Sequence, residues 1–211
     1  MTPTAGSTNP SKAQTDRRPD FFAGFDLAAE ILSTVPASTL RSRTPCPGYD
    51  VATLVSHLVG AANRAAALGR GVVEGGESQF PDIELSDSAE LIRLAKKEAQ
   101  RAWADDSRLT ATTTMPWGET YEGYTLVDMY LAELAAHSWD LAAATGRLAR
   151  LEELGSQLAG PALQGARSML KPEYRNAMGE GNPFGSEVTV PAQSTEWDRF
   201  AGFMGRDPKW S

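Results

Sequence analysis

Cysteine is almost absent from this 211-residue chain, in which Cys46 stands alone. A single cysteine cannot form an internal disulfide, and this excludes the disulfide framework of a small secreted scaffold. An export signal is not expected either, because Pro19 and Asp20 interrupt the apolar stretch that should follow Arg17 and Arg18. We therefore expect a cytoplasmic protein.

Basic residues are few, since 20 lysines and arginines stand against 27 acidic residues, for a formal net charge of -7. A nucleic-acid surface needs clustered basic side chains to neutralise phosphates, and no such cluster occurs. No window approaches the run of about 18 apolar residues that marks a membrane span. We expect neither a nucleic-acid nor a membrane partner, and both a monomer and a homodimer stay open.

Motifs for nucleotide and serine-nucleophile chemistry are absent as well. The chain has no Gly-x-Ser-x-Gly elbow, no phosphate loop of the Gly-x-x-x-x-Gly-Lys type and no full Gly-x-Gly-x-x-Gly fingerprint. It does have enough apolar sequence, 41% of its residues, to bury a core. We expect a disordered tail over residues 1–18, then one domain over 19–211 with a C-terminal extension from about 171.

Apolar residues recur at helical spacing in several segments, which proline and glycine separate. Asp50 is the predicted N-cap of the second helix, and Ser86 or Asp87 that of the third. Thr125 and Asp128 form a variant capping box for the fourth. The predicted helices span about 20–35, 51–68, 86–103, 125–146, 151–170 and 194–204.

Two details of this pattern can be checked in the structure. The third helix is predicted to turn six side chains inward: Leu91, Leu94, Ala95, Ala99, Ala102 and Trp103. The Thr-rich stretch 109–115 is a candidate extended segment, and Glu187–Val190 is strand-like. Because helix dominates, we expect a mainly α helical bundle, with α+β as the alternative.

The two histidines, His57 and His137, are the residues best suited to metal binding or acid-base chemistry near neutral pH. Glu133 precedes His137 by four positions, so both side chains lie on one face of a helix. With 27 acidic residues in the chain, chance alone gives a histidine about 0.5 such neighbours. The pair lies in the apolar stripe, however, where a carboxylate needs a partner or a metal ion.

His57 lies at the edge of the apolar face of its own helix and can reach the same interior. Two imidazoles and one carboxylate suit a zinc ion with an open fourth position, and the same set also suits ferrous iron. The alternative is a buried ion pair between Glu133 and His137, with His57 unrelated. Asp140, three residues after His137, is either a hydrogen-bond acceptor for its imidazole or a carboxylate on the helix surface.

Other residues have a functional and a structural interpretation. Arg64 lies two turns beyond His57 and either holds an anionic substrate or covers apolar surface. Cys46, between two prolines, is interpreted as a small packing residue and not as a nucleophile. Four aromatic residues either line a pocket or pack in the core: Trp117, Tyr121, Tyr124 and Tyr130.

Three segments together resemble a known family, the N-terminal metal-binding domain of mycothiol-dependent maleylpyruvate isomerase within the DinB-like superfamily. The first is Thr44-Pro-Cys-Pro-Gly-Tyr-Asp50 followed by Val55-Ser-His57-Leu-Val-Gly60, and the second is Met115-Pro-Trp-Gly118. The third and most specific is Glu133-Leu-Ala-Ala-His137-Ser-Trp-Asp140-Leu-Ala-Ala-Ala-Thr-Gly146. They occur in the family's order, and the resemblance covers roughly residues 20–150.

The resemblance implies a four-helix bundle of up-down-down-up order with extra C-terminal helices. It also implies that His57, Glu133 and His137 bind a divalent ion, expected to be zinc, with nickel or ferrous iron as alternatives. The expected function is a mycothiol-dependent S-transferase or isomerase acting on a small electrophile. A counterpart of the isomerase's additional C-terminal domain is not found after Lys171, so maleylpyruvate is not the expected substrate. The alternatives are a metal-dependent hydrolase and a non-catalytic metal-binding or sensor module.

Overall fold

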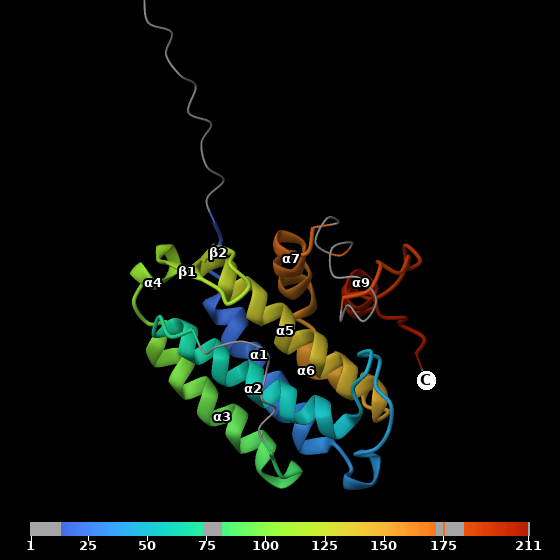
Figure 1. The fold of residues 1–211 in the computed structure, drawn as a ribbon. Helices are drawn as coiled ribbons and strands as arrows, with labels where there is room; N and C mark the ends of the chain where they lie inside the picture. The colour runs from blue at the N-terminus through green and yellow to red at the C-terminus, as the bar shows by residue number, and fades with distance from the viewer. Residues whose placement is uncertain (1–13, 74–81, 172–174, 176–183, 211) are drawn as a thin grey trace, which may run out of the picture.

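The computed structural model describes residues 14–73, 82–171, 175 and 184–210. Residues 1–13 of the predicted tail lie outside this part, and residues 14–17 precede the first helix. Figure 1 shows long helices side by side, with shorter elements at their ends. The elements are α1 (Arg18–Thr34), η1 (Ala37–Thr39), α2 (Val51–Gly69), α3 (Leu85–Ala102), α4 (Ser107–Thr110), β1 (Thr112–Thr114), β2 (Thr120–Glu122), α5 (Gly123–Ala144), α6 (Leu148–Gly155), α7 (Ala159–Met169) and α9 (Glu196–Phe203).

The four long helices, α1, α2, α3 and α5, form a bundle in which α1 and α2 each contact both α3 and α5. Helices α2 and α3 run parallel. Near their first turns, Thr53 and Ala89 line the same cavity. Near their last turns, the indole N–H of Trp103, just after α3, donates a hydrogen bond to the carbonyl of Ala65 in α2 at 2.9 Å. Phe21 of α1 contacts the same Trp103, so α1 starts where α3 ends. Helix α5 starts beside Arg108, just beyond that end. The expected up-down-down-up order is therefore confirmed.

The described residues contain two short strands only, β1 and β2, which pair antiparallel with Thr113 opposite Tyr121. The mainly α fold class is confirmed, and the α+β alternative is wrong. The Thr-rich stretch is extended only at β1, since α4 occupies its first residues. The segment Glu187–Val190 forms no strand, although the N–H of Val188 donates to the carbonyl of Gly202 at 2.9 Å.

The predicted helix starts are correct for α2 and wrong for α3 and α5. The side chain of Asp50 accepts a hydrogen bond from the N–H of Thr53 at 2.8 Å, as an N-cap does. Helix α3 begins at Leu85 without a side-chain cap. Helix α5 begins at Gly123, and Asp128 pairs with Arg17 at 3.1 Å instead of capping the helix.

The inward face of α3 agrees with the predicted one except at Leu94. Ala95, Ala99 and Trp103 are buried as predicted, and Leu91 and Ala102 are partly buried against the core. Leu94, however, is 47% exposed, whereas Ile92, which was not predicted to face inward, is fully buried.

Helices α6, α7 and α9 pack around α5, and Gly165 of α7 lies against the backbone of Asp128 near the start of α5. The single helix predicted over 151–170 is in fact two, α6 and α7, and the predicted terminal helix is confirmed as α9. Thr195 and Asp198 form a capping box at its start. Trp197 and Phe200 of α9 are buried, so this helix is part of the core.

Helix α2 is more apolar than the sequence analysis allowed. A window of 18 residues within this 19-residue helix has a mean hydropathy of 1.2, which passes the length and hydropathy criteria for a membrane span, so the statement that no window approaches one is wrong. Within the bundle, 61% of that window is buried. Burial against the other helices accounts for the apolar composition, as for a core helix.

Candidate metal centre

Helices α2 and α5 bring His57, Glu133 and His137 together. His57 Nε2 lies 2.9 Å from Glu133 Oε1, and His137 Nε2 lies 3.4 Å from the same oxygen. The two imidazole rings meet edge to face with their centroids 4.7 Å apart. One ligand atom from each residue lies within 4.8 Å of the other two. His57 thus contacts the Glu133 carboxylate directly, and the interpretation that leaves it unrelated does not fit.

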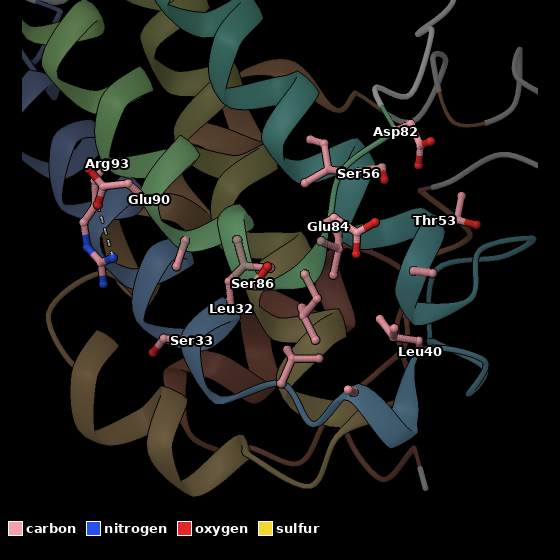
Figure 2. A pocket seen from close by; sticks show the side chains of 17 residues that line it. Leu32, Ser33, Leu40, Thr53, Ser56, Asp82, Glu84, Ser86, Glu90 and Arg93 are labelled. Atoms are coloured by element: carbon pink, nitrogen blue, oxygen red, sulfur yellow. Dashed lines mark ion pairs between the residues drawn. The ribbon is translucent and has the colours of Figure 1, made fainter.

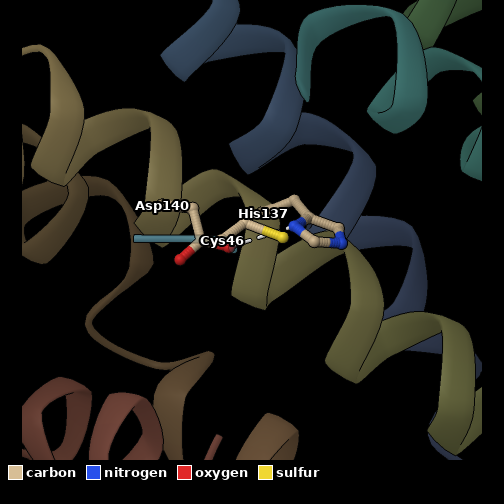
Figure 3. Close-up of side chains that lie close together, drawn as sticks. All are labelled: Cys46, His137 and Asp140. Atoms are coloured by element: carbon tan, nitrogen blue, oxygen red, sulfur yellow. Dashed lines mark hydrogen bonds and ion pairs between the residues drawn. The ribbon is translucent and has the colours of Figure 1, made fainter. Parts of the chain in front are cut away.

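Asp140 orients His137 from the far side of the ring. Its Oδ2 accepts a hydrogen bond from His137 Nδ1 at 3.1 Å, which leaves Nε2 directed at Glu133. Figure 3 shows this contact as a dashed line. Asp140 is fully buried, so it is not the surface carboxylate of the alternative interpretation.

Arg206 completes this arrangement, and the sequence analysis did not single it out. Its Nε and Nη2 bind Asp140 Oδ1 and Oδ2 at 3.0 and 2.8 Å, and its Nη1 donates to the carbonyl of Met204 at 2.7 Å. The side chain is only 2% exposed. In the sequence, the indication was a charged residue shortly after a predicted helix. Such a residue does not show which acidic residue pairs with it.

Ionisation in this cluster follows from its charges. Burial raises the pKa of Glu133, yet the charge of His137 and hydrogen bonds from both histidines hold that pKa well below its ordinary value. Burial lowers the pKa of His137, but Glu133 and Asp140 outweigh it and raise that pKa to about 9. Burial likewise raises the pKa of Asp140, and Arg206 with His137 brings it below its ordinary value. The two carboxylates are therefore ionised, as ligands and acceptors must be.

The three residues line a cavity of about 590 Å³. Arg64, Trp117, Tyr121 and Tyr130 also line it, and Trp117 is largely exposed at 58%. Tyr124 does not line the cavity and packs against the core instead. The candidate residues are thus accessible to a small molecule from one side.

Cys46 lines the same cavity and is 1% exposed. Burial, followed by the charge of Asp140, raises the pKa of its thiol to about 12. Cys46, His137 and Asp140 form a second group whose ligand atoms lie close together (Figure 3). Arg206 already occupies both oxygens of Asp140, and its positive charge opposes a cation there. Of the two groups, only the one with His57 and Glu133 suits a metal ion.

A larger cavity, of about 1020 Å³, lies between α1 and the first turns of α2 and α3. Its side chains, shown in Figure 2, include Leu32, Ser56, Glu84 and Arg93. Neither group of candidate metal ligands found among the described residues lies in it. The smaller cavity is therefore the one that contains the candidate metal ligands.

Comparison with known proteins finds one family model and two relatives. Residues 21–142 match the family model of the mycothiol maleylpyruvate isomerase N-terminal domain. Two proteins of Mycobacterium tuberculosis, from strains CDC 1551 / Oshkosh and H37Rv and both described as uncharacterized, are 29% identical to the chain over 181 residues. These alignments cover 86% of this chain and 92% of each relative. No solved structure matches the chain significantly.

The family match covers more than half of the chain. It includes α2, α3 and most of α1 and α5, with His57, Glu133, His137 and Asp140, whereas Arg206 lies beyond it. The chain therefore belongs to the mycothiol maleylpyruvate isomerase N-terminal domain family.

Proposed function

We propose that this protein holds one divalent ion, zinc, between His57, Glu133 and His137 and uses it in thiol chemistry on a small electrophile. The thiol is mycothiol or a similar low-molecular-weight thiol, and the reaction is an S-transfer or an isomerisation. The observation that carries the proposal is the position of the three donors on the wall of a cavity of about 590 Å³. A cavity of that size admits a small molecule.

The donor set and its spacing fit zinc. Two ligand atoms about 2.1 Å from a tetrahedral zinc ion lie roughly 3.4 Å apart. The observed separations of Glu133 Oε1 from the Nε2 atoms of His57 and His137, 2.9 and 3.4 Å, are of that size. Two imidazoles and one carboxylate form the type of set that leaves a fourth position open.

A divalent ion bound there would lower the pKa of a thiol at the open position, so that the nucleophilic thiolate exists at neutral pH. The chain's own residues hold and shield this site. Asp140 keeps the Nε2 of His137 turned toward Glu133. Tyr49 lies against the ring of His57, with centroids 5.4 Å apart, and restricts its movement.

A structural or sensor ion would need a fourth protein ligand. Among the described cysteine, histidine and acidic residues, only His57, Glu133 and His137 belong to this group. Three protein ligands favour an open position, and hence an enzyme, over a closed structural site.

Cobalt substitution tests the proposal. The experiment uses the Cys46→Ala variant, so that the added thiol is the only thiol in the sample. Mycothiol added to the cobalt-loaded protein should produce a sulfur-to-metal charge-transfer band. The further change His137→Ala should abolish the band, whereas Glu119→Gln, which alters a cavity carboxylate outside the donor group, should leave it in place.

The opposite result has a defined meaning. If mycothiol and other small thiols all leave the cobalt spectrum unchanged, the thiol proposal is wrong. The same site would then support hydrolysis by a metal-activated water, the second candidate.

A further inference from the structure

Arg64 differs from the other arginines of the described residues. It lies on α2, seven residues after His57, and lines the cavity. The other described arginines that are not fully exposed each form an ion pair or a hydrogen bond, for example Arg93 with Glu30 and Arg108 with the carbonyl of Leu68. Arg64 is half-buried and has no such partner within the described residues.

Arg64 is half-buried as a residue, but its guanidinium nitrogens are not among the buried side-chain atoms that lack a partner, so its charged head keeps contact with solvent. The aliphatic stem of an arginine can cover apolar surface while its head stays hydrated. A hydrated guanidinium without a protein partner has all its N–H groups available for a ligand. Here the residue lines the cavity that also contains His57 and Glu133.

The charges along the cavity limit what can bind. Arg64 is the only lysine or arginine among the described lining residues, and the acidic ones are Glu119 and Glu133. Glu119 accepts a hydrogen bond from the hydroxyl of Tyr121, and Glu133 contacts the two histidines. One guanidinium beside two carboxylates suits a singly charged anion better than a phosphate dianion.

The remaining walls are largely aromatic, formed by Tyr49, Trp117, Tyr121, Tyr130 and Phe184. Such walls bind apolar or planar carbon frameworks. Seven residues of helix separate Arg64 from His57 by roughly 10 Å along the axis. The cavity thus contains one guanidinium, the candidate metal ligands and aromatic walls.

We propose that Arg64 binds the carboxylate of a small organic acid whose apolar part lies between the aromatic side chains. This inference rests on the proposed function, because it assigns a chemical class to the electrophilic substrate. A planar guanidinium pairs with a carboxylate through two parallel hydrogen bonds, which fixes the orientation of the acid as well as its presence. Arg64 is then a specificity-determining residue.

The test uses two probes of similar shape, 3-phenylpropanoate and its uncharged carboxamide, 3-phenylpropanamide, with binding measured by calorimetry. The protein should bind the acid about 10- to 100-fold more tightly than the amide. Arg64→Gln should reduce binding of the acid to the level of the amide and leave the amide unchanged. Arg64→Lys should retain part of the preference, because it keeps the charge without the planar fork.

The matched control is Arg70→Gln, which alters an exposed arginine just after the same helix and outside the cavity lining. It should not change either affinity. A zinc ion also binds carboxylates, so each measurement is made on zinc-loaded and on metal-free protein. Circular dichroism checks that every variant remains helical.

Two results would overturn the inference: equal binding of acid and amide by the unaltered protein, or a preference for the acid that survives Arg64→Gln. The cobalt spectrum separates this failure from failure of the proposed function. Arg64→Gln should keep the thiol-dependent band in the Cys46→Ala background, because the donor group is intact. A missing band together with a preference that depends on Arg64 would leave an acid-binding cavity without thiol chemistry.

Discussion

Arg206 binds both carboxylate oxygens of Asp140 across 66 positions of sequence. Both side chains are buried, and the carboxylate also accepts a hydrogen bond from the candidate metal ligand His137. One carboxylate therefore connects the segment after α9 to the candidate metal centre. The family match ends at residue 142, so it includes Asp140 but not Arg206.

The first prediction separates two expected roles of the Asp140–Arg206 pair, the orientation of His137 and the stability of the fold. Asp140→Ala should weaken zinc binding about 10- to 100-fold, because His137 loses the acceptor that orients it. Arg206→Leu should lower the free energy of unfolding by about 3–5 kcal/mol, because it leaves the Asp140 carboxylate buried without its counter-ion. Chelator competition measures the first effect, and urea unfolding of metal-free protein measures the second.

The double variant Asp140→Leu/Arg206→Leu should recover much of the lost stability, because it removes both buried charges. It should not recover zinc affinity, because His137 still lacks its acceptor. Arg199→Leu is the control, because this exposed arginine of α9 only donates to the carbonyl of Ala192. If Arg206→Leu proves as stable as the unaltered protein, the pair has no structural role.

The second prediction concerns the ligands. Elemental analysis of gently purified protein should find one divalent ion per chain. His57→Ala, Glu133→Ala and His137→Ala should each weaken metal binding strongly while circular dichroism stays helical, because the bundle has a sufficient core without the ion. Protein that contains no metal and also refuses zinc, nickel and ferrous iron would refute the site. Global unfolding of all three variants would instead indicate a structural ion.

The third prediction concerns Cys46. With a pKa of about 12, its thiol is almost entirely protonated near pH 8. Alkylation by iodoacetamide should be on the order of 10³-fold slower in the folded protein than in the urea-unfolded chain. Cys46→Ala should keep both metal binding and most activity. Rapid stoichiometric alkylation of the folded protein, or loss of activity with the ion still bound, would show that the thiol is reactive.

The fourth prediction is a pH dependence. A thiol must lose its proton to occupy the open position, so its apparent affinity should rise about tenfold per pH unit below the pKa of the free thiol and level off above it. Titrating mycothiol into cobalt-loaded Cys46→Ala protein at several pH values measures this slope. The S-methyl derivative, which has no thiol proton, should not produce the band at any pH. A flat profile for mycothiol itself would mean that it binds without losing the proton.

The fifth prediction tests the packing that positions α5. A Cβ added to Gly123 would lie 2.0 Å from the carbonyl oxygen of Arg108, so Gly123→Ala should destabilise the protein by about 1–3 kcal/mol or more. Gly24→Ala is the comparison, because its Cβ would meet Leu134 Cδ1 at an ordinary 3.5 Å. In a helix interior this change should stabilise by roughly 0.5–1 kcal/mol. Urea unfolding measures both, and equal stabilities would contradict the tight junction.

Sequence reasoning was most successful where the information is local. Asp50 is a short-range cap, and Glu133 and His137 share a face because four residues make about one turn. The contact of His57 with Glu133 depends on how α2 packs against α5, and neither helix encodes that alone. The family resemblance therefore supplied the ligand set more firmly than spacing did.

The failures have physical causes as well. Leu94 was predicted to face inward because leucine is strongly apolar, yet it lies on the exposed side of α3, whose buried face contains Ile92 and alanines. Asp128 was predicted to be part of a helix cap, but it pairs with Arg17 instead. This contact depends on how distant segments pack. Arg206 could not be assigned at all, because an arginine in the sequence does not show which of the acidic residues it will neutralise.

The order of synthesis adds a consequence to the pairing of Asp140 with Arg206. The ribosome completes α5 long before it adds the arginine, and chains fold from the N-terminus as they emerge. Before Arg206 is present, the Asp140 carboxylate lacks the counter-ion that it has in the folded protein. Formation of this buried pair therefore belongs to the last steps of folding.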